Sequence, residues 1–115
     1  MQKKYSLNYT FYSDAGHGWL AVPLDEISAL GLHHIISPYS YLDENFAYLE
    51  EDSDAPKFDK ALSLEIGKDE FERVLLSRPL YSPNESPIRR KTRFNLDNFK
   101  LLKMRKAERH EQKSK

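Results

Sequence analysis

The first 23 residues of the chain have the pattern of a β-hairpin, which commits the fold to an antiparallel sheet. Residues 5–12, YSLNYTFY, alternate polar with apolar side chains and are rich in aromatic residues, as half-buried strands are. The next six residues, SDAGHG, combine serine, aspartate and glycine, which favour turns. Residues 19–22 predict a second strand that ends at Pro23, so the two strands pair across a loop longer than two residues.

Helical and extended patterns alternate along the rest of the chain. Apolar spacing and capping residues predict helices at 24–30, at 53–66 with Ser53 or Asp54 as the cap, at 69–78 and at 95–111, although 69–78 also suits a strand. Short strands are expected at 33–41, interrupted by Pro38, at 46–49 and at 88–94, with an exposed loop at 80–87. We therefore expect an α+β fold: a small antiparallel sheet packed by two or three helices, plus a basic C-terminal helix.

The length of 115 residues suits one α+β domain at 1–94 followed by a basic helical extension at 95–115. Cysteine is absent, which excludes a disulfide framework, a thiolate zinc site and a cysteine nucleophile, and suits a reducing cytosol. No apolar run approaches the roughly 20 residues of a membrane span, and the first strand pattern is not that of a signal peptide. We expect a cytoplasmic protein with no cofactor and no membrane partner.

The formal net charge of zero hides a division between two parts of the chain. Residues 1–85 hold 15 acidic and 7 basic residues, whereas residues 86–115 hold 3 acidic and 11 basic residues. Seven of the acids lie between positions 43 and 59. Such a density can mimic phosphates and enter a basic groove on a protein partner, bind a hard cation, or form a solvated loop. For a protein partner, the expected contacts are Glu50, Glu51, Asp52 and Asp54.

The basic end of the chain allows three interpretations. Its helix has apolar residues only in the first turns, so its start is expected to dock on the domain while its end projects into water. The projecting part can lie along a phosphate backbone, contact an acidic protein surface, or act as a solubilising tail. For a nucleic-acid partner, the expected contacts are Arg89, Arg90, Arg93, Lys103 and Arg105.

His17 lies between two glycines in the predicted turn and is a candidate general base or metal ligand, with Asp14 as its nearest partner. Neither a serine nucleophile elbow nor an HExxH pattern accompanies it. The competing interpretation is structural: the glycines permit a tight turn, and Trp19 fills the core beneath the hairpin. His33 and His34 are expected to point to opposite faces of a strand, one packed and one solvated, and no metal is expected there.

Several segments together resemble a family of small uncharacterised proteins carried by phages, plasmids and other mobile elements. The segments are SDAGHGWL, ISPYSY, YLEEDSD and SPIR, and the resemblance covers about residues 9–94. It implies a genomic setting and no particular enzyme activity or cofactor. The last 20 residues depart from the pattern as an added basic helix.

The first function expected is therefore a non-enzymatic protein that binds and inhibits a host protein or nucleoprotein complex, such as a defence system, in the manner of anti-CRISPR or anti-restriction proteins. The acidic stretch, with His17 and Trp19 at the recurring turn, would make the contact. Three alternatives stay open: a nucleic-acid-binding accessory protein that uses the basic segment, a small enzyme that uses His17 and Asp14, and head-to-tail association of copies through their opposite charges.

Overall fold

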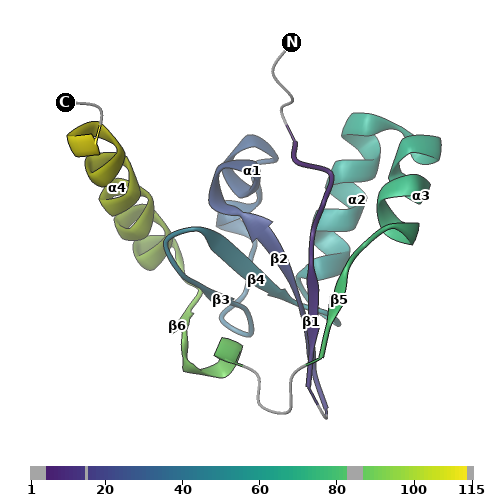
Figure 1. Ribbon diagram of the computed structural model, residues 1–115, viewed down its shortest axis with the longest axis horizontal. Coiled ribbons are helices and arrows are strands. Elements are labelled where there is room, and N and C mark those ends of the chain that lie inside the picture. Colours follow the sequence, from purple (N-terminus) through teal and green to yellow (C-terminus); the bar gives the residue numbers. More distant parts are fainter. Residues whose placement is uncertain (1–4, 15, 83–86, 114–115) are drawn as a thin grey trace.

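The protein has an α+β fold built on one six-stranded sheet, as its computed structural model shows (Figure 1). The structure describes residues 5–14, 16–82 and 87–113, with side chains to residue 108. The strands are β1 (Phe11–Ser13), β2 (Gly18–Pro23), β3 (Tyr41–Leu42), β4 (Phe46–Glu50), β5 (Leu80–Tyr81) and β6 (Thr92–Arg93). The α-helices are α1 (Leu24–Ala29), α2 (Ala55–Ile66), α3 (Lys68–Leu76) and α4 (Leu96–Lys113), and the 3-10 helices are η1 (Leu32–His34) and η2 (Pro87–Arg90).

The strands are arranged in the order β5-β1-β2-β4-β3-β6. All neighbouring pairs are antiparallel except β1 and β5, which are parallel. The hairpin expected at the start of the chain is confirmed, with Phe11 opposite Leu20 and Tyr12 opposite Trp19. Because side chains alternate along a strand, β2 sends Leu20 and Val22 to one face of the sheet and Trp19 to the other.

One face of the sheet carries the main hydrophobic core. Apolar residues from β2, β3 and β4 pack there against side chains from all four α-helices, so the helices cover this face. Phe99 of α4 is 2% exposed and belongs to the same core, whereas the helix is exposed from Met104 to Glu108. The basic helix therefore docks by its start, as its apolar pattern predicts. None of the helices in the described residues is long and apolar enough to cross a membrane.

The opposite face of the sheet is aromatic and is covered by a short basic segment instead of a helix. Trp19, Tyr41 and Tyr48 pack there with Ala21 beneath Ile88 of η2. Tyr12 is partly buried and packs against this cluster. We call residues 87–93 the cover segment: η2 lies over this face, and β6 extends the sheet beside β3. The expected strand at 88–94 is thus correct only for β6, since the residues before it turn as a 3-10 helix.

Two other expected strands are wrong over much of their length. Residues 5–10 do not form the first part of β1, because Leu7 has a left-handed backbone (φ 65°) that breaks the extended chain. The region 33–41 begins as η1, and only its end enters the sheet as β3. Leu32 and Ile36 are both buried, and their spacing of four residues suits a turn of helix better than a strand.

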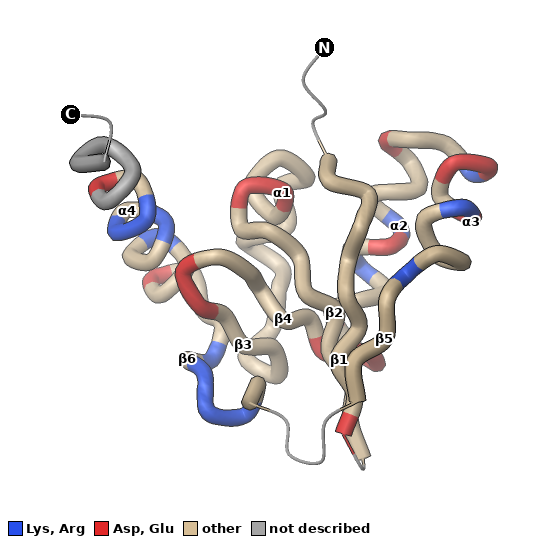
Figure 2. Tube along the Cα trace, viewed as in Figure 1, with Lys and Arg blue, Asp and Glu red and all other residues tan. Residues whose placement is uncertain are grey.

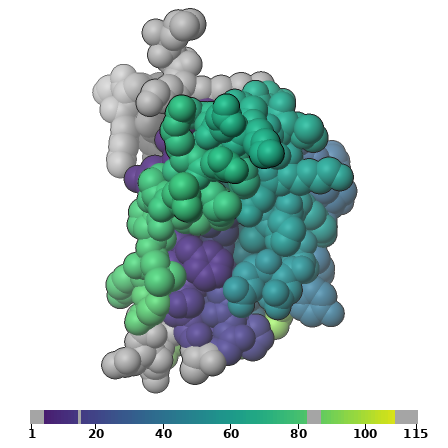
Figure 3. Space-filling model, turned by 90° about the vertical axis from the view of Figure 1, so that its right-hand side faces the viewer, coloured from purple at the N-terminus to yellow at the C-terminus, as the bar shows by residue number. Residues whose placement is uncertain are grey.

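The region 80–87, expected to be an exposed loop, is exposed at positions 80–82 but begins as edge strand β5 beside β1. Residues 83–86 of that expected loop lie outside the described residues. Of the two interpretations of 69–78, the helix is confirmed as α3. Figure 3 shows this side of the molecule, where α2 and α3 form the upper part and β5 runs below them.

Candidate functional site

A pocket with a volume of about 400 Å³ opens on the aromatic face of the sheet. We call it the sheet pocket. Its lining residues are His17, Trp19, Tyr39, Tyr41, Glu50, Asp52, Ser53, Arg89 and Arg93. These residues come from four separate segments of the chain, at positions 17–19, 39–41, 50–53 and 89–93. The fold therefore brings the β1–β2 turn, the start of β3, the end of β4 and the basic segment after residue 87 to one place.

The β1–β2 turn is shaped by Asp14. Its carboxylate accepts hydrogen bonds from the backbone N–H groups of Gly16 (3.1 Å) and His17 (3.0 Å), as turn aspartates commonly do. The turn places the His17 ring nearly parallel to the indole of Trp19, with ring centroids 5.9 Å apart and an interplanar angle of 21°. Trp19 is only 2% exposed, and its buried indole N–H donates to none of the described residues.

Arg89 of the cover segment joins both parts of this turn. Its Nε donates to Asp14 at 3.0 Å, its Nη2 lies 2.6 Å from His17 Nδ1, and its guanidinium lies 5.2 Å from the centre of the Trp19 ring. The hydrogen bond from Arg89, followed by that from the Gly16 backbone, holds the pKa of Asp14 below its usual range. The same carboxylate raises the pKa of Arg89.

The contact with Arg89 sets the hydrogen-bonding role of the His17 ring. A guanidinium only donates hydrogen bonds, so Nδ1 of His17 accepts and the ring carries its proton on Nε2. Asp14 does not contact the ring: it binds backbone N–H groups and Arg89. The His17–Asp14 pair expected for an enzyme does not form, because the aspartate is used to shape the turn.

Two more basic residues of the cover segment lie over aromatic rings in the same way. Lys91 Nζ is 5.1 Å from the centre of the Tyr48 ring, and the Arg93 guanidinium is 5.0 Å from that of Tyr41. With Arg89 they occupy alternate positions, so three cations face three rings. Each such contact contributes about 0.5–1 kcal/mol where it is solvent-exposed.

Hydrogen bonds from Lys91 and Arg93 hold the second half of the cover segment in place. Lys91 donates to Asp43 at 3.0 Å, and Arg93 donates to the Pro38 carbonyl at 2.9 Å. Burial alone would raise the pKa of Asp43, but hydrogen bonds from Tyr48, from two backbone N–H groups and from Lys91 hold it below the usual range. Burial, followed by the bond to Asp43, raises the pKa of Tyr48.

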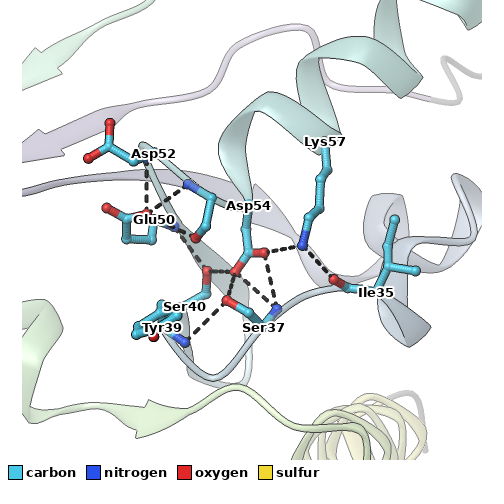
Figure 4. Close-up of polar contacts among 9 residues, drawn as sticks. Ile35, Ser37, Tyr39, Ser40, Glu50, Asp52, Asp54 and Lys57 are labelled. Carbon is cyan, nitrogen blue, oxygen red and sulfur yellow. Dashed lines mark hydrogen bonds and ion pairs between the residues drawn. The ribbon is translucent and has the colours of Figure 1, made fainter.

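Asp54 lies behind the pocket and connects, through Ser37 and Ser40, the segments that carry Tyr39 and Glu50 (Figure 4). Its carboxylate, fully buried, accepts from Ser37 N–H and Oγ, from Ser40 Oγ and from Lys57 Nζ (2.9 Å). Ser37 Oγ in turn accepts from the backbone N–H of Tyr39, and Ser40 Oγ from that of Glu50. Asp54 occupies the N-cap position of α2, but its side chain makes no capping hydrogen bond there.

The four acids expected to contact a protein partner differ in their exposure and in their contacts. Asp54 is buried and unavailable to a partner, which corrects that expectation. Glu50 is half-buried, and one of its carboxylate oxygens accepts from the N–H groups of Asp52 (3.0 Å) and Ser53 (2.8 Å). Only Glu51 and Asp52 are exposed. Trp19 is the floor of the pocket and not a projecting contact.

The basic residues expected to contact nucleic acid also divide. Arg89 and Arg93 line the sheet pocket, and Arg90 lies between them on the cover segment. Lys103 of α4 binds Ser28 Oγ at 2.8 Å and lies 3.6 Å from Asp25, whereas Arg105 is exposed on the projecting half of that helix. Figure 2 shows basic residues along η2, β6 and α4, and others on α2 and α3.

The two oppositely charged parts of the chain meet within one molecule. Ion pairs join Arg89 to Asp14, Lys91 to Asp43 and Lys103 to Asp25. Part of the charge division in the sequence is thus used to hold the cover segment and α4 on the domain.

His33 and His34 stand side by side on η1, with ring centroids 4.1 Å apart, instead of on opposite faces of a strand. His33 stacks on Phe99 at 5.5 Å, and His34 is exposed, so one ring is packed and one solvated as expected. Burial, followed by the charge of His34, lowers the pKa of His33. Over the described residues, no group of three or more histidine, aspartate or glutamate side chains is placed to hold a metal ion.

Tyr39, Tyr41 and Ser53 line the pocket but were not among the site residues predicted from the sequence. The signal for the tyrosines was present in PYSY, where two aromatic residues flank a serine and so share one side of an extended chain. Comparisons of this chain with protein-family models, with curated proteins and with solved structures give no match.

Proposed function

We propose that this protein is a non-enzymatic binding protein that holds single-stranded nucleic acid in the sheet pocket, in the cytoplasm of its host cell. The observation that carries the proposal is the meeting of Arg89 and Arg93 with three aromatic residues in one pocket. Proteins that bind single strands combine cationic groups for the backbone with aromatic rings on which bases stack.

Arg89 and Arg93 are preorganised to bind an anion. Each guanidinium has five N–H donors, and the contacts above use two of those of Arg89 and one of those of Arg93. Both groups are held over aromatic rings and by hydrogen bonds, so little rotational freedom remains to be lost on binding. Phosphate oxygens are the acceptors that suit such preorganised donors.

Tyr39 supplies the surface for stacking. Its side chain is 69% exposed at the pocket, while its backbone is held by the Ser37 hydroxyl. An exposed aromatic ring on an anchored backbone is the arrangement on which an unpaired base can stack. Beyond the pocket, β6 leads directly into α4, whose exposed Lys100, Arg105 and Lys106 can follow the continuing backbone.

A protein partner, the function first expected from the sequence, has less support. It depends on an acidic surface, but of its four expected contacts only Glu51 and Asp52 are exposed. The origin of the chain in a mobile element stays a prediction, and neither function depends on it.

The test is fluorescence anisotropy with a labelled, mixed-sequence single strand of about 12 nucleotides and with the matching duplex. We expect the single strand to bind more tightly. If Arg89 and Arg93 each neutralise one phosphate, they contribute about −1.4 to the slope of log K against log salt. Arg93→Ala should reduce that slope by about 0.7, which loss of folding alone would not do.

Tyr39→Ala is the second variant, because the Tyr39 ring is largely exposed and belongs to neither buried cluster, so its removal should leave the fold intact. Stacking contributes about 1–3 kcal/mol per base, so affinity should fall about 5- to 150-fold. Tyr81→Ala is the matched control: Tyr81 is also exposed but lies on β5, outside the pocket. Equal effects of the two variants, or no binding of either strand at low salt, would refute the proposal.

A further inference from the structure

The sheet pocket contains two carboxylates that phosphate binding does not explain. Glu50 and Asp52 line it together with Arg89 and Arg93. A pocket that served only to hold an anion would be weakened by negative charges beside its arginines, because like charges repel. The ligand should therefore offer hydrogen-bond donors as well as an anionic group.

The two carboxylates are arranged as separate acceptors. One oxygen of Glu50, Oε2, is used internally: it accepts from Asp52 N–H (3.0 Å), Ser53 N–H (2.8 Å) and Ser53 Oγ (2.9 Å). These bonds fix the side chain, while Oε1 accepts from no residue in the described part of the chain. The Asp52 carboxylate makes no contact there either, and Figure 4 shows both groups on the side of the chain away from Asp54.

We propose that Glu50 and Asp52 make the sheet pocket selective for guanine as the base of the nucleotide it holds; this inference rests on the proposed function. Guanine offers two adjacent donors, N1–H and the N2 amino group. Adenine and cytosine offer one amino group beside an acceptor, and uracil one N–H between two carbonyls. A pair of acceptors therefore satisfies guanine and faces lone pairs on the other bases.

The rest of the pocket fits the remaining parts of a guanine nucleotide. Its volume of about 400 Å³ lies in the range of sites for small molecules. Arg89 and Arg93 can take the phosphate, and Tyr39 can stack on the base.

The test uses the full chain and four nucleoside monophosphates, with guanine, adenine, cytosine or uracil as the base. Trp19 is the only tryptophan and lines the pocket, so its fluorescence reports binding, and calorimetry gives the affinity. We expect the guanine nucleotide to bind at least about 5-fold more tightly than each of the others, because a good bidentate contact discriminates by that much or more.

Glu50→Gln separates base selection from general charge effects. The amide oxygen can keep the three internal hydrogen bonds, and the amide N–H₂ then replaces the acceptor Oε1. The ratio of guanine to uracil nucleotide affinity should fall to about one, whereas a lost negative charge alone would raise both affinities equally. Glu51→Gln is the control, because this neighbouring acid does not line the pocket and should leave the ratio unchanged.

The outcomes distinguish this inference from the function on which it rests. Equal affinities for all four nucleotides, or a guanine preference that survives in both Glu50→Gln and Asp52→Asn, would overturn guanine selection. Binding of the single strand with no base preference would leave the proposed function standing. If neither nucleotides nor single strands bind, the proposed function fails with it.

Discussion

Of the two glycines beside His17, only Gly18 has a steric reason to be glycine. A Cβ atom on Gly18 would lie 2.3 Å from Cζ of Phe11, far inside van der Waals contact, and 3.1 Å from a carboxylate oxygen of Glu51. A Cβ atom on Gly16 would meet nothing within 4 Å. Gly18 is therefore required by the packing of the Phe11 ring across the hairpin, which the sequence alone did not distinguish from a need for turn flexibility.

Gly18→Ala should destabilise the protein. The Phe11 ring must move to admit the methyl group, and overpacking of this kind costs about 1–3 kcal/mol. Urea unfolding followed by circular dichroism measures the change. Gly16→Ala is the control, with an expected change within about 0.5 kcal/mol. Equal stability of the two variants would contradict the role given to Phe11.

Asp54 should behave as a structural anchor and not as a surface acid. Asp54→Ala leaves the hydroxyls of Ser37 and Ser40 without their acceptor, so we expect a loss of about 2–4 kcal/mol in the free energy of unfolding. This range allows for Lys57, which is partly exposed and can turn to water. Asp52→Ala, at an exposed site, should change stability by less than about 0.5 kcal/mol, and a similar effect of both changes would argue against the anchor.

At the scale of elements, the position of the cover segment is the part of the fold that could not be predicted from the sequence. The hairpin, β4, α2 and α4 were predictable because their patterns are local: alternation, apolar periodicity and caps. The cover segment depends on pairings over long sequence distances, such as Arg89 with Trp19 and Lys91 with Asp43. Its run of basic residues was interpreted as a surface for other molecules, since no local pattern shows that aromatic rings lie beneath it.

Ile88→Ala tests whether the cover segment is an integral part of the fold. Ile88 is 1% exposed between Trp19 and the other aromatic residues, so the cavity should cost about 2–4 kcal/mol. Water entering beside Trp19 should shift its emission to longer wavelength in the folded state. Ile35→Ala, at an exposed position, should change neither quantity. An unchanged emission spectrum in folded Ile88→Ala would show that the segment does not shield Trp19.

At the scale of the whole molecule, opposite charges along the sequence become contacts within one chain. Asp14 and Asp43, whose pKa values are lowered, each hold a residue of the cover segment. Groups with a lowered folded-state pKa stabilise the protein fully above the pKa of the unfolded chain, about 3.9 for aspartate, and lose this effect as the pH falls through the folded-state value.

The contribution of these groups to the free energy of unfolding should therefore stay constant between about pH 7 and pH 5, and should fall below about pH 4. Urea titrations at fixed pH measure it. The stability difference between the natural chain and Asp43→Asn should shrink over the same acidic range, because the protonated carboxyl resembles the amide. A difference that stays constant to pH 2 would contradict the assignment.

The candidate site was predicted in its parts but not as a whole. His17, Trp19, Glu50, Asp52, Arg89 and Arg93 were all singled out from the sequence, but for three different functions. Only the sheet order, which places β3 between β4 and β6, brings their segments around one pocket. That order is set by non-local pairing and could not be deduced from any single segment.

The most direct test of the account is the indole N–H resonance of Trp19 in a ¹⁵N-labelled protein. The chain has one tryptophan, so one indole signal reports on the floor of the sheet pocket. Titration with a single-stranded oligonucleotide should shift this signal saturably, together with the backbone signals of Tyr39 and Arg93. Saturable binding that leaves the indole signal unmoved and shifts only residues of α4 would contradict the account.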